Sequence, residues 1–341
     1  MDRFNSTLVF TSGLIAMFVL PGCSNHPVKT ETAALHPIDI KEWRVPWDQT
    51  RPRDPYVDQQ HRVWFVGQGG DYIAVLEPEV GQFHQFKLDS GTGPHNLIVD
   101  EEGQIWYAGN RAAHIGTLDP ATGSITKYPM PDPNATDPHT LIFGKNRDIW
   151  FTVQQGNFVG HLDMAVGHIQ LMPLPTPHAR PYGIVMGSDR APWFVEFGTN
   201  KLGTIDPDTH TVREIPLSRS EARPRRLAVT SNGVIWYVDH AEGYLGSYHP
   251  TTGHIQEWLV PGGTDARPYG MTVDDQDRVW FVETGSNPNR LVGFDTRTRT
   301  VISLTGINSG GGTVRHMVYH HPTRTIWFGT DTNTIGRARI P

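Results

Sequence analysis

The chain has 341 residues, and its 29 Lys and Arg against 35 Asp and Glu give a formal net charge of −6. This mild charge is spread along the chain without a basic run, which argues against a nucleic-acid partner. Cys23 is the single cysteine of the sequence, which excludes an intramolecular disulfide and thiol catalysis in the folded body.

An apolar run over residues 8–20 follows Arg3 and ends at Pro21-Gly22-Cys23. The run is too short for an ordinary membrane span and suits the core of a signal peptide. It resembles a bacterial lipoprotein signal, which implies a signal peptide over residues 1–22, lipidation of Cys23 and a polar tether over residues 23–37. We therefore expect a lipoprotein of the bacterial cell envelope, at the outer membrane or facing the periplasm. An ordinary secretory signal with a secreted product, or a short membrane anchor, is the alternative.

A Trp-aromatic pair recurs along the rest of the chain at gaps of 42, 44, 43, 43, 44 and 47 residues. Its seven copies are Trp64-Phe65, Trp106-Tyr107, Trp150-Phe151, Trp193-Phe194, Trp236-Tyr237, Trp280-Phe281 and Trp327-Phe328. A period in the forties, built from short strands, is typical of a β-propeller with one repeat per blade. We expect the aromatic pairs to fill the space between blades.

Each repeat reads as four strands. The first follows a Pro-[His/Tyr] pattern, as at 93–100, 137–144, 180–187 and 267–274, and is irregular around Pro55-Tyr56 in the first repeat. The second strand carries the aromatic pair, and the third ends in a turn such as 202–207. Residues 38–45 resemble the fourth strands, of which the last repeat has none of its own. They are predicted to complete the last blade and remove two open sheet edges. The predicted fold is an all-β, seven-bladed propeller over residues 38–341.

Polar side chains are expected to meet at one mouth of the axial channel. Because adjacent strands are antiparallel, the start of each first strand lies beside the end of each second strand. The first set is Tyr56, His95, His139, Tyr182, Arg225, Tyr269 and His316. The second set is Asn110, Gln154, Glu196, Asp239, His240, Glu283 and Asp331. Such a ring around a concave mouth is a candidate binding site; alternatively, the repeated positions hold turns between blades.

The last repeat differs from the others. His316 follows a glycine-rich stretch at 309–312 without a preceding proline, and Asp331 lies four residues past Trp327. His316 is therefore a candidate general base. One carboxylate near it is fewer than a hard cation prefers.

The units at 181–217 and 268–284 resemble the virginiamycin B lyase (streptogramin lyase) family, and the resemblance extends over about residues 38–341. It implies a propeller that linearises cyclic depsipeptide antibiotics of the streptogramin B type by elimination. In that reaction a histidine takes the α-proton beside the ester, Mg²⁺ stabilises the developing negative charge, and the C–O bond breaks.

The resemblance assigns roles to residues of this chain. The family's base lies in a Glu-Pro-His motif, which corresponds here to Val314-Arg315-His316, so the histidine is retained and the glutamate position holds Val314. The family's second metal carboxylate corresponds to Asp331, and Glu283 is the carboxylate of this chain that could compensate for the missing glutamate; these two are the expected ligands of Mg²⁺. A substrate-contacting histidine of the family falls on Tyr269. The remaining expected substrate contacts are Tyr182, His139, His95 and Arg225.

Three functions remain open at this point. The first is a lyase acting on a cyclic depsipeptide or another ester, with His316 as base. The second, suggested by Val314, is a non-catalytic envelope-anchored propeller that binds a ligand or protein at the channel mouth. The third is a metal-dependent lactone hydrolase. For each we expect a monomer that contacts the membrane only through its lipid anchor.

Overall fold

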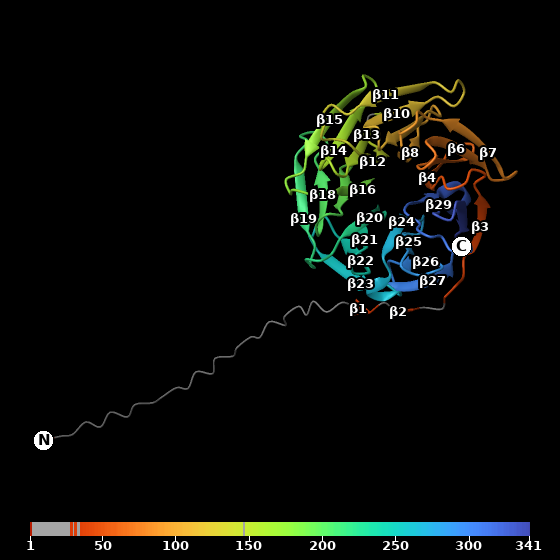
Figure 1. Ribbon diagram of the computed structural model, residues 1–341. Helices are drawn as coiled ribbons and strands as arrows, with labels where there is room; N and C mark the ends of the chain where they lie inside the picture. Colours follow the sequence, from red (N-terminus) through yellow and green to blue (C-terminus); the bar gives the residue numbers. More distant parts are fainter. Residues whose placement is uncertain (2–27, 30, 33–34, 146) are drawn as a thin grey trace.

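The computed structural model describes residues 28–29, 31–32, 35–145 and 147–341, together with Met1. Within these residues the strands form seven antiparallel sheets around a central axis (Figure 1), which confirms the predicted seven-bladed propeller. The predicted signal peptide and Cys23 lie outside the described residues. In the described ranges, no helix is long and apolar enough to cross a membrane.

In six blades the chain runs outward through four consecutive strands, and in the last blade through three. The inner strands are β4 Pro52–Val57, β8 Pro94–Val99, β12 Pro138–Phe143, β16 Pro181–Met186, β20 Pro224–Val229, β24 Pro268–Val273 and β28 Met317–His320. The second strands are β5 Val63–Gly67, β9 Ile105–Gly109, β13 Asp148–Val153, β17 Pro192–Glu196, β21 Ile235–Asp239, β25 Arg278–Glu283 and β29 Thr325–Gly329. The third strands are β6 Tyr72–Glu77, β10 His114–Leu118, β14 Phe158–Asp163, β18 Lys201–Ile205, β22 Tyr244–Tyr248, β26 Arg290–Asp295 and β30 Thr334–Arg339.

The outer strands complete the blades. They are β7 Gln82–Lys87, β11 Ile125–Pro129, β15 His168–Pro173, β19 Val212–Pro216, β23 Ile255–Leu259, β27 Thr300–Gly306 and β3 Asp39–Arg44. Two single 3-10 turns, η1 Gly263–Asp265 and η2 His321–Thr323, lie between strands.

In four blades, the repeated tryptophan of the second strand bonds to an aspartate in the turn that follows the inner strand. Trp64 and Trp280 are at most 1% exposed. Their indole N–H groups donate to Asp58 and Asp274, each at 2.8 Å. Each aspartate follows its inner strand, so one aromatic side chain both fills the space between blades and fixes a turn.

A glycine in the third strand makes room for the second aromatic of the pair. Gly203 lies opposite Phe194 in the strand ladder. A Cβ atom at Gly203 would stand 2.1 Å from Cζ of the Phe194 ring, closer than any real contact. Only glycine therefore lets the ring lie flat across the neighbouring strand.

The ring is closed by β3, which precedes the first blade in the chain. β3 pairs antiparallel with β30, from Asp39 opposite Arg339 to Arg44 opposite Thr334. Trp43 of β3 stacks on Trp327 of β29, with ring centroids 5.4 Å apart. The predicted closure by residues 38–45 is thereby confirmed, because the last blade takes its outer strand from the other end of the chain.

Two short strands before β3 lie at the rim of the disc. Strand β1 (Val28–Lys29) pairs parallel with β23, and β2 (Glu31–Thr32) pairs parallel with β27. Figure 1 shows both short strands along the outside of the fifth and sixth blades. Part of the predicted tether therefore adds to two sheet edges that the blades leave open.

Trp43→Ala tests the closure. The substitution removes a buried aromatic side chain from the joint between the first and last strands, and we expect a loss of about 3 kcal/mol in the free energy of unfolding. Denaturant unfolding measures it. Arg44→Ala is the matched control, since the neighbouring Arg44 side chain is 78% exposed and should change stability by less than about 0.5 kcal/mol. Equal losses in both variants would contradict a stabilising joint.

Candidate functional site

The starts of the inner strands and the ends of the second strands lie at the same end of the channel, as predicted. Pro181 pairs with Glu196 and Pro224 with Asp239, and a proline takes the same position in six of the seven blades. The register then shifts before the next ladder pair. Such a bulge re-aims the side chains beside it, and here these are the residues that follow the prolines.

Five predicted substrate contacts lie together and fill the channel at this level. The rings of His95 and His139 have centroids 3.5 Å apart, and those of His139 and Tyr182 are 4.0 Å apart. The hydroxyl of Tyr182 hydrogen-bonds to that of Tyr269. The Arg225 guanidinium lies 3.8 Å from the Tyr269 ring. His95, His139, Tyr182 and Tyr269 are each less than 5% exposed, so the layer closes the channel.

Tyr56 does not join this layer, and its predicted place was wrong. In the first blade Pro52, not Pro55, takes the repeat position, because Pro52 pairs with Gly67 as Pro94 pairs with Gly109. Arg53 therefore stands where His95 stands in the second blade. The spacing of 42 residues from Pro52 to Pro94 equals that from Trp64 to Trp106 and could have revealed this register.

A buried carboxylate that the sequence analysis missed holds the centre together. Asp54 is 1% exposed and accepts from Arg53 Nε at 3.0 Å. Its other oxygen accepts from Asn96 Nδ2 at 3.1 Å and from Arg226 Nη2 at 3.3 Å. Burial favours the neutral acid, but Arg53, His316 and Arg226 outweigh burial and hold the pKa of Asp54 well below its usual range. Asp54 is therefore ionised at neutral pH.

His316 lies one residue away from the predicted register. Met317 pairs with Phe328 in the last blade as Leu227 pairs with Tyr237 in the fifth. His316, the residue before Met317, therefore corresponds to Arg226, the residue before Leu227. The entry to this strand is also longer. Asp331 N bonds to Gly311 O, six residues before Met317, whereas His240 N bonds to Arg223 O, four residues before Leu227. Two extra residues after the glycine-rich stretch displace His316 from the layer of His95 and His139.

This shift places His316 at the polar inner end of a cavity of about 430 Å³. Arg226 and Asn96 share this end. The apolar walls are Leu97, Leu141, Ile184, Leu227, Met271 and Met317. The cavity reaches the carboxyl ends of the inner strands, where His321 is exposed. It therefore extends away from the layer of His95 and Tyr269.

His316 is neutral in this position. Burial lowers its pKa most, Arg226 lowers it further, and Asp54 partly opposes them, which leaves the pKa at about 4. Its Nδ1 atom is buried and has no hydrogen-bond partner among the described residues. A neutral imidazole beside a cavity can accept a proton from a bound molecule.

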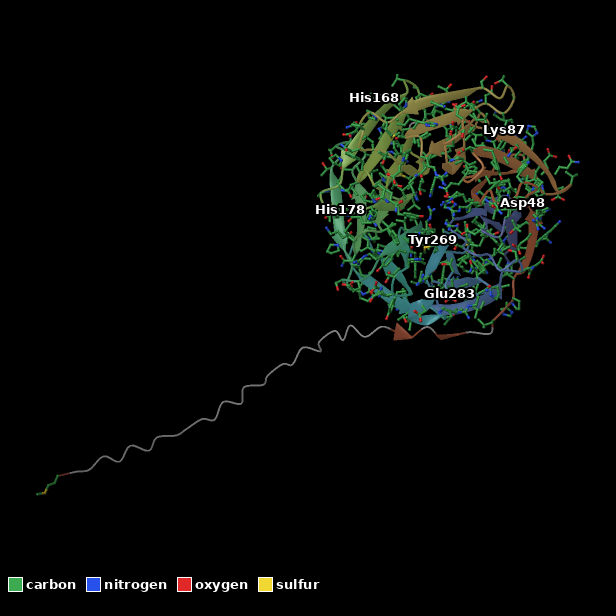
Figure 2. All side chains as sticks on the ribbon, in the orientation of Figure 1. Asp48, Lys87, His168, His178, Tyr269 and Glu283 are labelled. Atoms are coloured by element: carbon green, nitrogen blue, oxygen red, sulfur yellow. The ribbon has the colours of Figure 1, made fainter. Side chains whose placement is uncertain are left out.

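The two carboxylates expected to hold Mg²⁺ do not fit that role. Glu283 accepts from Arg290 Nε at 2.9 Å and from Gly262 N at 2.6 Å, and Figure 2 shows it farther from the axis than Tyr269. Asp331 is paired with Arg315, and Arg51 Nε lies 3.9 Å away. In the described part of the chain, no three His, Cys, Asp or Glu side chains gather as metal ligands.

The carboxylates that end the second strands hold turns instead, which was the alternative interpretation. Asp239 Oδ1 accepts from the backbone N–H groups of Arg223 and Ala241, at 2.8 and 3.0 Å. Its other oxygen pairs with Arg219 Nη2 at 2.7 Å. Glu196 accepts from Thr199 Oγ1 at 2.6 Å, and burial raises its pKa to about 7.

Asp54→Asn tests the central network. The variant leaves Arg53 and Arg226 buried without their carboxylate, and we expect a loss of about 3–5 kcal/mol in unfolding free energy at neutral pH. Because the folded pKa of Asp54 is depressed, its contribution is present above the unfolded pKa and is lost as pH falls below about 4. Denaturant unfolding between pH 7 and 3 should show that the difference between wild type and variant shrinks with acid.

The control for this experiment is Asp89→Asn. Asp89 pairs with Lys127 on the surface, where its side chain is 78% exposed, so its loss should leave the free energy of unfolding nearly unchanged. If Asp54→Asn lost as little unfolding free energy as Asp89→Asn, Asp54 would not hold the blades together.

Comparison with known proteins follows this geometry. A model of the virginiamycin B lyase family matches residues 33–286, which ends before the last blade and His316. A search of curated protein sequences gives no match.

Solved structures agree on the fold. A streptogramin B lyase structure is 27% identical with a TM-score of 0.81, over 91% of this chain and 100% of that one. Virginiamycin B lyase from Staphylococcus aureus is 24% identical with a TM-score of 0.81, over 89% and 100%. The extracellular domain of a putative hybrid two component system from B. thetaiotaomicron, 14% identical with a TM-score of 0.69 over 89% and 43%, shares the fold. Since the family model matches most of the sequence, the chain belongs to the virginiamycin B lyase family.

Proposed function

We propose that the protein is a carbon–oxygen lyase that opens an ester by elimination, with His316 as the general base. The observation that carries this proposal is the position of His316 beside Arg226 at the inner end of an apolar cavity. Apolar walls with a few convergent polar groups are the usual form of a small-molecule site. Family membership supports the same class of reaction.

His316 and Arg226 have different roles in the proposed reaction. Neutral His316 takes the proton from a carbon next to a carbonyl group, so that the C–H bond breaks. The electron pair forms a carbon–carbon double bond, and the ester oxygen leaves as a carboxylate. Arg226 supplies fixed positive charge where the negative charge develops. No water enters the product, so product and substrate have equal mass.

Arg226 is assigned the role of stabilising the negative charge because the expected metal ligands are not placed to hold a cation there. Glu283 and Asp331 each contact an arginine, and neither lines the cavity with His316. The proposed reaction therefore has no step through Mg²⁺. Positive charge from Arg226 remains available because Asp54 balances only part of the local cationic charge.

A cyclic depsipeptide of the streptogramin B type is the first substrate to test, because streptogramin B lyase is among the similar structures. The cavity volume of about 430 Å³ lies at the lower end of the ordinary range for ligand pockets. It holds a small ester or one arm of a larger ring, with the rest of the ring outside the cavity. Small esters with an acidic α-proton belong in the same panel of substrates.

His316→Ala should lower kcat/KM at least about 100-fold, since it removes the group that accepts the proton. Mass spectrometry of the product provides the measurement, and ring opening without a change of mass is expected. Asp331→Asn is the matched control: Asp331 lies at the other end of the channel, so this variant should retain wild-type turnover.

Because the pKa of His316 is about 4, kcat/KM should rise with pH through about 4 and stay level above it.

Three outcomes decide between the open functions. A product heavier by one water molecule would replace elimination with lactone hydrolysis. Full activity of His316→Ala would remove the assigned base. A wild type that binds the ester but never turns it over would favour the second candidate, a non-catalytic ligand-binding propeller. That candidate is favoured by one specific observation, namely that the arginine contacts of Glu283 and Asp331 occupy both expected metal ligands.

Attachment to the cell envelope through Cys23 remains a prediction from the sequence. Incorporation of labelled lipid into the wild type and its loss in Cys23→Ser would support it, since the cysteine is the predicted acylation site. Labelling that survives in Cys23→Ser, or a wild type without label, would contradict the lipoprotein assignment.

A further inference from the structure

The channel carries more positive charge than the described residues balance. Arg53 and Arg226 both pair with Asp54, while Arg225 has no carboxylate partner. Three guanidinium groups against one carboxylate leave two net positive charges, since 3 − 1 = 2. Buried charges in proteins are normally paired, because leaving one unpaired costs several kcal/mol.

The carboxylates nearest the mouth do not supply the missing negative charge. Asp239 is taken by Arg219 and Glu283 by Arg290. Glu196 lies against Thr199, and its pKa of about 7 leaves it only partly ionised at neutral pH. Asp239 and Glu283 are therefore already neutralised by arginines outside the layer.

Buried donors at the same level lack partners. Arg53 is 5% exposed, and its Nη2 group has no hydrogen-bond acceptor among the described residues. Nε of Arg225 is likewise buried without an acceptor. An unsatisfied buried donor costs as much as a lost hydrogen bond, and more when it is charged. Two such donors, on two arginines, indicate an acceptor that comes from outside the chain.

The neighbouring side chains are suited to an anion. Tyr182 and Tyr269 share one hydrogen bond between their hydroxyls, which leaves the second hydroxyl hydrogen free to donate. Burial opposes ionisation of Tyr182, yet Arg225, Arg53 and Arg226 outweigh burial and lower its pKa. His95 and His139 stay neutral, because burial and the nearby arginines keep their pKa values well below 6.5. The positive potential therefore comes from the guanidinium groups.

We propose that the layer formed by Arg53, His95, His139, Tyr182, Arg225 and Tyr269 binds a small monovalent anion. Arg53 Nη2, Arg225 Nε and a tyrosine hydroxyl are the donors. The acceptor is a halide ion or the carboxylate group of an organic acid, two sources that share the same chemistry. The site is separate from the cavity of His316, which these six residues do not line.

The site is reached from the end of the channel opposite the His316 cavity. Arg225 and His240 are half-buried there, with Arg225 Nη1 lying 2.9 Å from His240 Nε2. The Arg225 guanidinium also stacks on Phe197 at 4.5 Å. Of the two arginines with unpaired donors, Arg225 is the more exposed and Arg53 the more buried.

The test measures the thermal unfolding midpoint of the full chain in chloride, formate or acetate. A bulky organic sulfonate keeps the ionic strength constant and serves as the reference. A small anion that binds only the folded state should raise the midpoint in a saturable way. Chloride alone raising the midpoint assigns a halide site, and formate or acetate raising it assigns a carboxylate site. No anion-specific rise in the wild type overturns the proposal.

Arg225→Gln should weaken the apparent affinity for the anion at least 10-fold. Because this change could also lower stability, each variant is compared with itself in sulfonate. Arg223→Gln is the matched control, as it removes a charge two residues away whose guanidinium bonds to the backbone oxygens of Ser220 and Ala222. The control should respond like the wild type. An equal response in Arg225→Gln would overturn the proposal.

His316→Ala separates this site from the proposed lyase activity. That variant should keep the full anion response while losing turnover, since His316 is not part of the layer. Loss of the anion response in His316→Ala, together with an intact fold, would contradict two independent sites.

Discussion

Arg226 joins blades that are far apart around the ring. Contacts in a propeller run mainly between neighbouring blades, but this side chain reaches Asp54 in the first blade, 172 residues away, and Thr140 in the third. Its Nε group also donates to Arg315 O in the last blade at 3.1 Å. One guanidinium group of β20 therefore links the fifth blade to β4, to β12 and to the residue two positions before β28. Both candidate sites lie against this contact, on opposite sides.

The two ends of the channel differ in chemistry as a result. On one side, bulges at the strand starts turn aromatic rings, histidines and Arg225 inward, and these side chains fill the space. On the other side, aliphatic residues of the same strands leave a cavity with His316 and Arg226 at its inner end. Both ends of the channel depend on a closed ring of blades, and β3 closes it by supplying the outer strand that the last blade would otherwise lack.

Periodicity predicted the fold correctly because each repeat must bury the same aromatic pair against its neighbour. The spacing of Trp64 and its counterparts defined the blades, and the resemblance of residues 38–45 to fourth strands identified the closure. Strand direction correctly placed His95, His139, Tyr182, Arg225 and Tyr269 beside the ends of the second strands, but not Tyr56 or His316. The site was predicted less well. Spacing could not locate the two extra residues before Met317, so His316 was assigned to the wrong layer. The pairing of Arg226 with Asp54 joins residues too distant for any local pattern to show.

The filled layer of arginine and aromatic side chains has a kinetic consequence. Because these side chains close the channel at that level, the cavity beside His316 is open at one end only. A molecule that enters must leave by the route through which it came, past Tyr319 and His321. Substrate and product then use the same opening, so a product that dissociates slowly occupies the cavity and prevents the next substrate molecule from binding.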